Sequence, residues 1–263
     1  MFSKLHLLLS YLSYAISSRH GKGRGIHSPF LYDFVSRILF DKNPYSDYFI
    51  MDSIVYGLKR SDIVMPVHEF GAGSRKFETK YRSLKAMVRS SSIQPKYGRL
   101  LYRIARHLKP SLTIELGTSL GVSSLWLSMG YPQGKVLTLE ADIKLCTFAG
   151  DLFRKHNISN IEVVNGIFDE ALPKICEKYP SPEMVFIDGN HSYAPTLEYF
   201  NFFADRMEKG ILVIDDIHWS KEMCRAWRTI IADPKANVTI DLYQLGIIVL
   251  DPSVTPGHYT IRF

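Results

Sequence analysis

The sequence predicts an α/β protein with a doubly wound, mostly parallel, Rossmann-like sheet and a helical N-terminal extension. Apolar runs alternate with helical stretches from Leu112 onward, which is typical of parallel strands joined by helices. The last two apolar runs, 238–242 and 245–250, are too close for a helix between them and predict an antiparallel hairpin. The first 18 residues carry leucines at helical spacing, which predicts an amphipathic helix.

Composition and charge restrict the class of protein. With 263 residues, 46% of them hydrophobic, the chain can bury a sizeable core, and no apolar run approaches the roughly 20 residues of a membrane helix. Cys146, Cys176 and Cys224 are widely spaced, which predicts reduced core residues in a cytoplasmic protein. Residues 1–110 carry 19 basic and 7 acidic residues, and residues 111–263 carry 13 and 19. The basic front is compatible with nucleic acid, a membrane surface or an anionic substrate, but its dispersed charges favour solvated helix faces.

The N-terminal part contains two glycine-rich stretches that we expect to be loops. Gly21–Gly25, GKGRG, lacks the G-K-[ST] ending of a phosphate-binding loop. Glu69–Ser74, EFGAGS, follows a lead that contains Pro66 and precedes a charged stretch, which argues against a nucleotide-binding strand and helix. We expect this loop to fold over the active site. Ser28 and Pro29 predict the start of a helix between the two loops.

Strands and helices alternate in the part of the chain that follows a predicted helix at 100–108. Further helices are expected at 143–156 and 196–207. In a parallel sheet of this kind, ligands bind beyond the carboxyl ends of the strands. The five parallel strands are expected at 112–116, 135–139, 161–164, 184–187 and 211–214.

Polar residues follow these strands at the edge where a ligand would bind. The turn Gly117–Gly121 leads from the first strand into a helix, and its glycines allow a sharp turn and close approach of the main chain to a ligand. A single acid at such a position usually caps the next helix. Acids that recur from strand to strand predict a shared site, and they stand at Glu115, Glu140, Asp142, Asp169, Asp188, Asp215 and Asp216.

The motifs IELGTSLGVSS, FIDGNHSY and LVIDDIHW, together with Glu140, resemble the class I S-adenosylmethionine-dependent methyltransferases. Within them the chain is similar to the small-molecule O-methyltransferases of the catechol O-methyltransferase kind. The resemblance covers roughly residues 96–250 and implies a sheet of five parallel strands closed by an antiparallel hairpin. It implies a methyltransferase domain at 96–263 and a helical, basic extension or cap at 1–95.

The resemblance also implies roles for residues. Gly117 to Gly121 would wrap the methionine moiety, and Glu140, 23 residues after Gly117, would bind both ribose hydroxyls. Phe168 would stack on the adenine. The implied cofactor contacts are Glu115, Gly117, Thr118, Ser119, Gly121, Ser123, Glu140, Ala141, Gly166, Phe168 and Asp188.

The later strand ends resemble the catalytic part of that family. Asp188, Asp215 and Asp216 resemble its divalent-metal cluster, which implies Mg²⁺ beside the acceptor oxygens. Asp216 stands where the family usually has asparagine, so the alternative is that the acids cap helices and orient the sulfonium without a metal. His191, three residues after Asp188, stands where the catechol enzymes have a lysine base and could accept a hydroxyl proton. His218 is a second candidate base.

The sequence therefore predicts a methyltransferase of the EC 2.1.1 class that acts on a small-molecule hydroxyl acceptor, with no membrane span and no nucleic-acid partner. The basic front is compatible with an anionic acceptor. One alternative is a nucleotide-dependent oxidoreductase, which Glu140 would also suit, but the turn lacks the third glycine of that fingerprint. A nucleic-acid methyltransferase would use the basic front, but Asp188–His191 replaces the Asn/Asp-Pro-Pro-aromatic turn of base-amino methyltransferases. A non-enzymatic scaffold would fail to bind S-adenosylmethionine.

Overall fold

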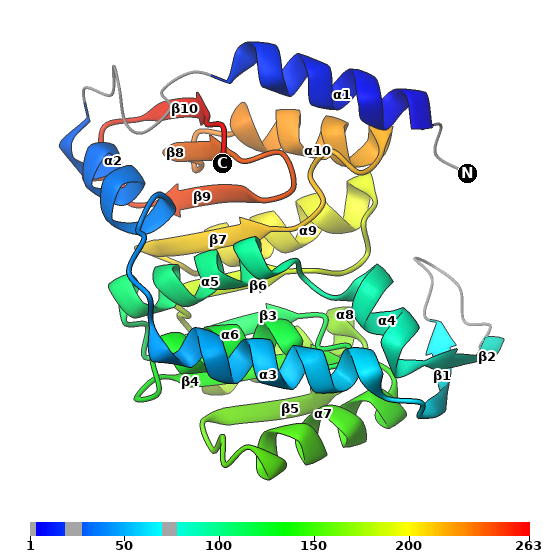
Figure 1. The fold of residues 1–263 in the computed structure, drawn as a ribbon. Coiled ribbons are helices and arrows are strands. Elements are labelled where there is room, and N and C mark those ends of the chain that lie inside the picture. The colour runs from blue at the N-terminus through cyan, green and yellow to red at the C-terminus, as the bar shows by residue number, and fades with distance from the viewer. Residues whose placement is uncertain (1–3, 19–27, 70–77) are drawn as a thin grey trace. The chain divides into compact units, whose positions relative to one another are not determined.

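The computed structural model describes residues 4–18, 28–69 and 78–263 (Figure 1). The chain divides into two compact units, of which one comprises residues 42–180 and the other residues 1–41 together with 181–263. This division falls elsewhere than the expected boundary between residues 95 and 96, and the predicted domain organisation stays a prediction.

Three parallel strands form the centre of the unit of residues 42–180. Its elements are α3 (Ser46–Arg60), β1 (Val64–Glu69), β2 (Glu78–Ser83), α4 (Leu84–Ser91), α5 (Pro95–Leu108), β3 (Leu112–Leu116), α6 (Val122–Gly130), β4 (Lys135–Glu140), α7 (Ile143–Lys155), β5 (Ile161–Asn165) and α8 (Phe168–Lys178). The strand order is β3-β4-β5, with Leu116 opposite Leu139 and Glu140 opposite Asn165. The carboxyl ends of these three strands therefore lie side by side.

The sequence accounts for the way the helices of this unit begin and end. Pro95 occupies the first turn of α5, where its missing N–H costs nothing, and Lys109 ends the helix in the left-handed region with φ 52°. Every residue of α6 is buried. At Gly130, an added Cβ would lie 2.5 Å from the main-chain oxygen of Tyr102, so glycine lets α6 approach α5 closely.

The segment around the EFGAGS stretch contains two strands that the sequence did not predict. β1 and β2 pair antiparallel, with Glu69 as the last residue of β1, and the rest of the predicted loop lies outside the described residues. The main-chain N–H of His68 donates to Asp142 and not to β2. Because alternate residues of a strand face the same side, Pro66 occupies a position whose N–H would also point away from β2. A proline there breaks no ladder hydrogen bond.

Five strands form the centre of the other unit. Its elements are α1 (Lys4–Ser17), α2 (Pro29–Phe34), the π-helix η2 (Val35–Leu39), β6 (Met184–Ile187), α9 (Tyr193–Ala204), β7 (Gly210–Ile214), α10 (Lys221–Ile231), β8 (Val238–Asp241), β9 (Gly246–Leu250) and β10 (Gly257–Thr260). β6 and β7 are parallel, whereas β9 runs antiparallel to both β7 and β8. The C-terminal strand β10 pairs parallel with β8.

Tyrosine hydroxyls connect the N-terminal helix α1 to the C-terminal part of the chain. The buried Tyr14 hydroxyl donates to the main-chain oxygen of Ile261 at 2.6 Å, and the Tyr243 hydroxyl donates to that of Leu7 at 3.0 Å. The amphipathic helix is thus confirmed, but much of its apolar face is exposed. The exposed fractions are 56% for Leu8, 56% for Leu9, 47% for Leu12 and 83% for Ile16.

The predicted fold class is confirmed. All five expected parallel strands are present, and the expected hairpin is formed by β8 and β9. Ser28 caps α2 by accepting a hydrogen bond from the main-chain N–H of Leu31. The Gly21–Gly25 stretch lies outside the described residues. Within the parts of the chain that the structure describes, no helix combines the length and apolar character needed to cross a membrane.

Candidate active site

The glycine turn, residues 117–121, joins β3 to α6 through three left-handed residues. Gly117, Ser119 and Gly121 have φ values of 109°, 47° and 79°. At Gly121, an added Cβ would also lie 2.6 Å from the Phe153 ring, so both conformation and space demand glycine there. The N-cap residue of α6 is Gly121, and in the described part of the chain no side-chain cap hydrogen bond forms at this helix start. Such a helix start favours an anionic ligand group.

The Glu140 carboxylate lies beside this turn at the end of β4. Its Oε2 accepts from the main-chain N–H of Ser119 at 2.9 Å, and its Oε1 accepts from that of Asp142 at 3.0 Å. Burial raises the pKa of the Glu140 carboxyl, although these N–H groups counteract part of the effect. The two oxygens are therefore fixed in orientation, and each retains acceptor capacity for a further hydroxyl.

The end of β5 and the residue after it hold the main chain on the other side of Glu140. Asn165 Nδ2 donates to the main-chain oxygens of Glu140 and Ala141, both at 3.0 Å, and the N–H of Gly166 also donates to Glu140 at 3.0 Å. Phe168 is the first residue of α8. Three of the predicted cofactor residues, Ala141, Gly166 and Phe168, thus follow β4 and β5, whose carboxyl ends are adjacent.

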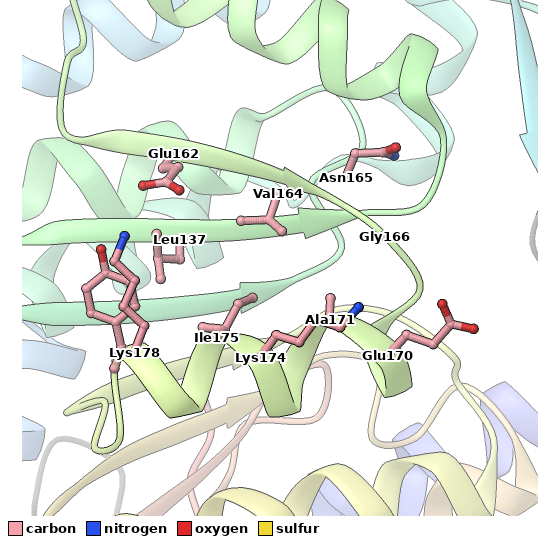
Figure 2. Close-up of a pocket in the computed structure, with 11 residues that line it drawn as sticks. Leu137, Glu162, Val164, Asn165, Gly166, Glu170, Ala171, Lys174, Ile175 and Lys178 are labelled. Atoms are coloured by element: carbon pink, nitrogen blue, oxygen red, sulfur yellow. The ribbon is translucent and has the colours of Figure 1, made fainter.

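A cavity of about 320 Å³ lies between β4, β5 and α8. Figure 2 shows Leu137 and Val164 on the strands facing Ile175 on the helix, while Gly166 lies at the strand end. Apolar walls with a few polar groups are usual in small-molecule pockets, and this volume is at the lower end of their range. The cavity reaches the strand end at which the adenine is expected.

Several predicted cofactor residues lie below the surface of the glycine turn. Glu115, Thr118 and Ser123 are 0%, 1% and 6% exposed. Thr138 Oγ1 donates to Glu115 Oε2 at 2.6 Å and lies 2.6 Å from Thr118 Oγ1. Ser124 also donates to Glu115. These buried side chains form hydrogen bonds beneath the glycine turn and stabilise it. Their direct contact with a cofactor stays a prediction.

The acid cluster, Asp188, Asp215 and Asp216, belongs to the other unit together with His191. His191 Nε2 lies 3.5 Å from Asp188 Oδ1. Burial alone would lower the pKa of His191, but the Asp188 and Asp216 carboxylates outweigh burial and raise it. Burial and the charges of Asp188 and Asp216 raise the pKa of Asp215 well above its ordinary value. The group therefore couples an imidazole to several carboxylates, which is suited to holding a proton.

The fit of this cluster to Mg²⁺ is incomplete. Carboxylate oxygens are the ligands that Mg²⁺ prefers. However, among residues 4–18, 28–69 and 78–263, no three His, Cys, Asp or Glu side chains are arranged to hold a metal ion. The chemistry of the donors thus agrees with the predicted metal site, and their arrangement does not support it.

His218, the second candidate base, has another partner. Its Nε2 lies 2.7 Å from Asp241 Oδ2, and its ring stacks on Tyr243 at 5.2 Å. Burial would lower the pKa of His218, but Asp241, with a smaller contribution from Cys224, raises it to about 9. An imidazole that carries its proton at neutral pH is a poor general base, which argues against His218 in this role.

The structure thus brings the predicted residues together in two groups, one in each unit, and the convergence of the groups on one ligand stays a prediction. Asp142, next to Glu140, was noted in the sequence as an acid near a strand end. Two further residues around Glu140, Asn165 and His68, were missed as functional candidates. These two act through contacts 24 to 74 residues apart in the chain, which no local pattern reveals.

Comparisons with known proteins agree with this geometry. A family model described as a methyltransferase domain matches residues 114–217. The catechol O-methyltransferase of Niastella koreensis is 30% identical over 128 residues, which cover 48% of this chain and 57% of that enzyme. An uncharacterized protein of Acanthamoeba polyphaga mimivirus is 30% identical over 56% of this chain and 71% of its own length.

A solved structure extends the likeness to most of the chain. The O-methyltransferase from Bacillus cereus, in complex with SAH, superposes with a TM-score of 0.55 at 18% identity and covers 84% of this chain and 97% of its own. At this identity the likeness concerns the fold. The glycine turn, the acids at the strand ends and the matching relatives together lead to one conclusion: the chain contains a methyltransferase domain at residues 114–217 and is similar to O-methyltransferases such as the catechol O-methyltransferase of Niastella koreensis.

Proposed function

We propose that this chain transfers a methyl group from S-adenosylmethionine to a hydroxyl group of a small molecule. The observation that carries the proposal is the Glu140 carboxylate, which is held by two main-chain N–H groups next to the start of α6. A fixed pair of carboxylate oxygens suits the two hydroxyls of a ribose. The names of the related enzymes support oxygen as the methyl acceptor.

The residues of the unit 42–180 would hold the cofactor in three parts. Glu140 would accept hydrogen bonds from the ribose hydroxyls. The glycine turn and the start of α6 would surround the methionine moiety, whose carboxylate the N–H groups favour. Ala141, Gly166 and Phe168 would border the adenine. When bound, S-adenosylmethionine supplies an activated methyl group on a sulfonium.

His191 is our proposed general base, with Asp188 as its partner. The imidazole would accept the proton of the acceptor hydroxyl, and Asp188, 3.5 Å from Nε2, would orient the ring and stabilise its protonated form. Asp216 adds to this stabilisation. The remaining contribution of the chain would be to hold the acceptor oxygen in line with the methyl group and to exclude water.

Magnesium, the acceptor and the cellular location are finer proposals. Three carboxylates of the acid cluster support testing Mg²⁺ as an additional component, and no step above depends on it. The basic N-terminal part supports an anionic acceptor. The three cysteines, Cys146, Cys176 and Cys224, are buried and widely spaced in the sequence, which supports a reducing location such as the cytoplasm.

The test uses the full chain and two measurements. Calorimetry with S-adenosylhomocysteine should give saturable binding at a one-to-one ratio. Methyl transfer from labelled S-adenosylmethionine should then be measured on catechol, on simple phenols that carry a carboxylate, and on RNA and DNA. Methylation of a small hydroxyl compound supports the proposal. Failure to bind S-adenosylhomocysteine at millimolar concentration would contradict it. Methyl transfer to RNA or DNA alone would favour a nucleic-acid methyltransferase.

A nicotinamide-dependent oxidoreductase was the other alternative, and the comparisons give it no support. The same preparation can exclude it. Addition of a nicotinamide cofactor and candidate alcohols should leave the absorbance of that cofactor unchanged, because the glycine turn lacks the third glycine of a dinucleotide fingerprint.

A further inference from the structure

The β1–β2 hairpin contacts the chain next to Glu140. The main-chain N–H of His68, in β1, donates to Asp142 Oδ2 at 2.6 Å, and His68 Nδ1 lies 3.4 Å from Asp142 Oδ1. The Asp142 side chain is 0% exposed. A buried carboxylate is tolerated only when hydrogen-bond donors surround it, and the hairpin supplies one of these donors from its main chain.

Asp142 connects this hairpin contact to the Glu140 carboxylate. Its own main-chain N–H donates to Glu140 Oε1 at 3.0 Å. The peptide between them is held on the other side by Asn165, which donates to the oxygens of Glu140 and Ala141. The position of the Glu140 carboxylate therefore depends on a short segment of main chain that β1 fixes from one side and β5 from the other.

The carboxylate of Asp142 does more than cap a helix. Its Oδ1 accepts from the main-chain N–H of Lys144 at 2.8 Å and caps α7. A serine could provide this cap with a single oxygen. The second oxygen, Oδ2, accepts from His68. A residue with two acceptor oxygens is needed only because the hairpin binds at this point.

We infer that the β1–β2 hairpin is part of the cofactor site, and that Asp142 is a positioning residue through which the hairpin sets the affinity for the adenosyl group. The inference rests on the proposed function, in which Glu140 binds the ribose. It gives a role to a segment that lies outside residues 114–217, the part of the chain that the methyltransferase family model matches.

The test is a double-mutant cycle on the full chain, read as the dissociation constant for S-adenosylhomocysteine by calorimetry. Asp142→Ser keeps the cap of α7 and removes the acceptor of the hairpin N–H. His68→Pro removes this N–H at a position that faces away from β2. Each change should weaken binding by about tenfold, and the double variant should bind no more weakly than either single one, because both remove the same contact.

Three controls separate positioning from loss of structure. Tyr81→Pro places a proline opposite Pro66 in the same hairpin, away from Asp142, and should leave the affinity unchanged. His68→Ala keeps the main-chain donor and should change the affinity by less than about twofold. In assays of methyl transfer, Asp142→Ser should raise the KM for S-adenosylmethionine and leave kcat, measured at saturating cofactor, unchanged.

The outcomes are distinct. If the unchanged chain does not bind S-adenosylhomocysteine, the proposed function falls, and this inference with it. If the unchanged chain binds but Asp142→Ser and His68→Pro bind equally well, only the inference is overturned. Additive losses in the double variant would show that the two residues act independently, which also overturns it.

Discussion

Two sets of carboxylates follow strand ends of the same kind in this molecule, and their surroundings differ. The oxygens of Glu140, in the unit of residues 42–180, accept main-chain hydrogen bonds from Ser119 and Asp142. In the acid cluster of the other unit, Asp215 is 5% exposed and its Oδ1 is buried with no hydrogen-bond partner in the described part of the chain. Its charged neighbours are Asp188 and Asp216.

The difference shows how main-chain surroundings decide what a carboxylate can do. Two N–H donors fix Glu140 as a pair of acceptors whose geometry is set before a ligand arrives, which suits a neutral diol. Carboxylates that face one another destabilise their charges and raise the affinity of the group for a proton or a cation. The comparison therefore supports our proposal that Glu140 binds the cofactor and that the acid cluster with His191 handles the proton.

The largest expected effect comes from His191→Ala. Removal of a general base should lower kcat by about a hundredfold, while the affinity for S-adenosylhomocysteine changes by less than about twofold. Steady-state kinetics and calorimetry on the same preparation give the two numbers. His258→Ala, which alters an exposed histidine on β10, is the matched control and should leave both unchanged. An unchanged kcat in His191→Ala would place the base elsewhere.

Glu140→Ala tests the opposite side of the comparison. Loss of both ribose acceptors should weaken the binding of S-adenosylhomocysteine by at least about tenfold, which corresponds to about 1.4 kcal/mol. Glu177→Ala removes an exposed glutamate of α8 that does not line the cavity beside β5, and it should leave the affinity unchanged. Equal affinities for Glu140→Ala and the unchanged chain would refute the ribose role and remove the distinction between the two sets of carboxylates.

The sequence predicted those features that depend on local pattern. The strands from β3 to β9 are recognisable in the sequence as short apolar runs. The position of Glu140 at the end of the strand next to the glycine turn was predicted from its distance to that turn. The burial of Glu115 could not be identified in this way. Its carboxylate is enclosed by Ser124 and Thr138, and the latter belongs to the adjacent strand. Whether an acid within an apolar run is buried or faces solvent depends on how the strand packs against its neighbours, which the run itself does not determine.

The hairpin β1–β2 was missed because one local signal was misleading and one contact is not local. Pro66 argued against a strand, but it lies where its missing N–H breaks no ladder bond. The contact of His68 with Asp142 spans 74 residues of chain. The leucines of α1 misled in another way, since helical spacing indicates a face but does not say whether that face is buried. The hydroxyl of the buried Tyr14 connects the helix to the C-terminal part of the chain.

The unit that contains the acid cluster has a second pair of an imidazole and a carboxylate, His218 and Asp241. This pair can be compared with His191 and Asp188. Asp241 outweighs burial and raises the pKa of His218 to about 9, against an ordinary value of 6.5. A pKa raised by folding stabilises the folded state fully below about pH 6.5, and this contribution is lost as the pH rises through about 9.

Asp241→Asn should therefore lower Tm by about 4 °C at about pH 6 and by much less at about pH 9.5. Thermal unfolding at the two pH values measures the difference, with Asp205→Asn, which removes an exposed ion pair with Lys235, as the control. An equal loss of Tm at both pH values would mean that Asp241 acts through packing or through its hydrogen bond to Tyr243 and not through the charge of His218.

The smallest expected effect concerns the metal. If the acid cluster handles a proton through His191, exhaustive treatment with EDTA should change the rate of methyl transfer by less than about twofold, because no proposed step requires a cation. Loss of activity in EDTA and its recovery with Mg²⁺, but not with Ca²⁺, would show that the three aspartates rearrange around a metal. The comparison between Glu140 and the acid cluster would then change, because the carboxylates around Asp215 would act as ligands of a cation and not as groups that hold a proton.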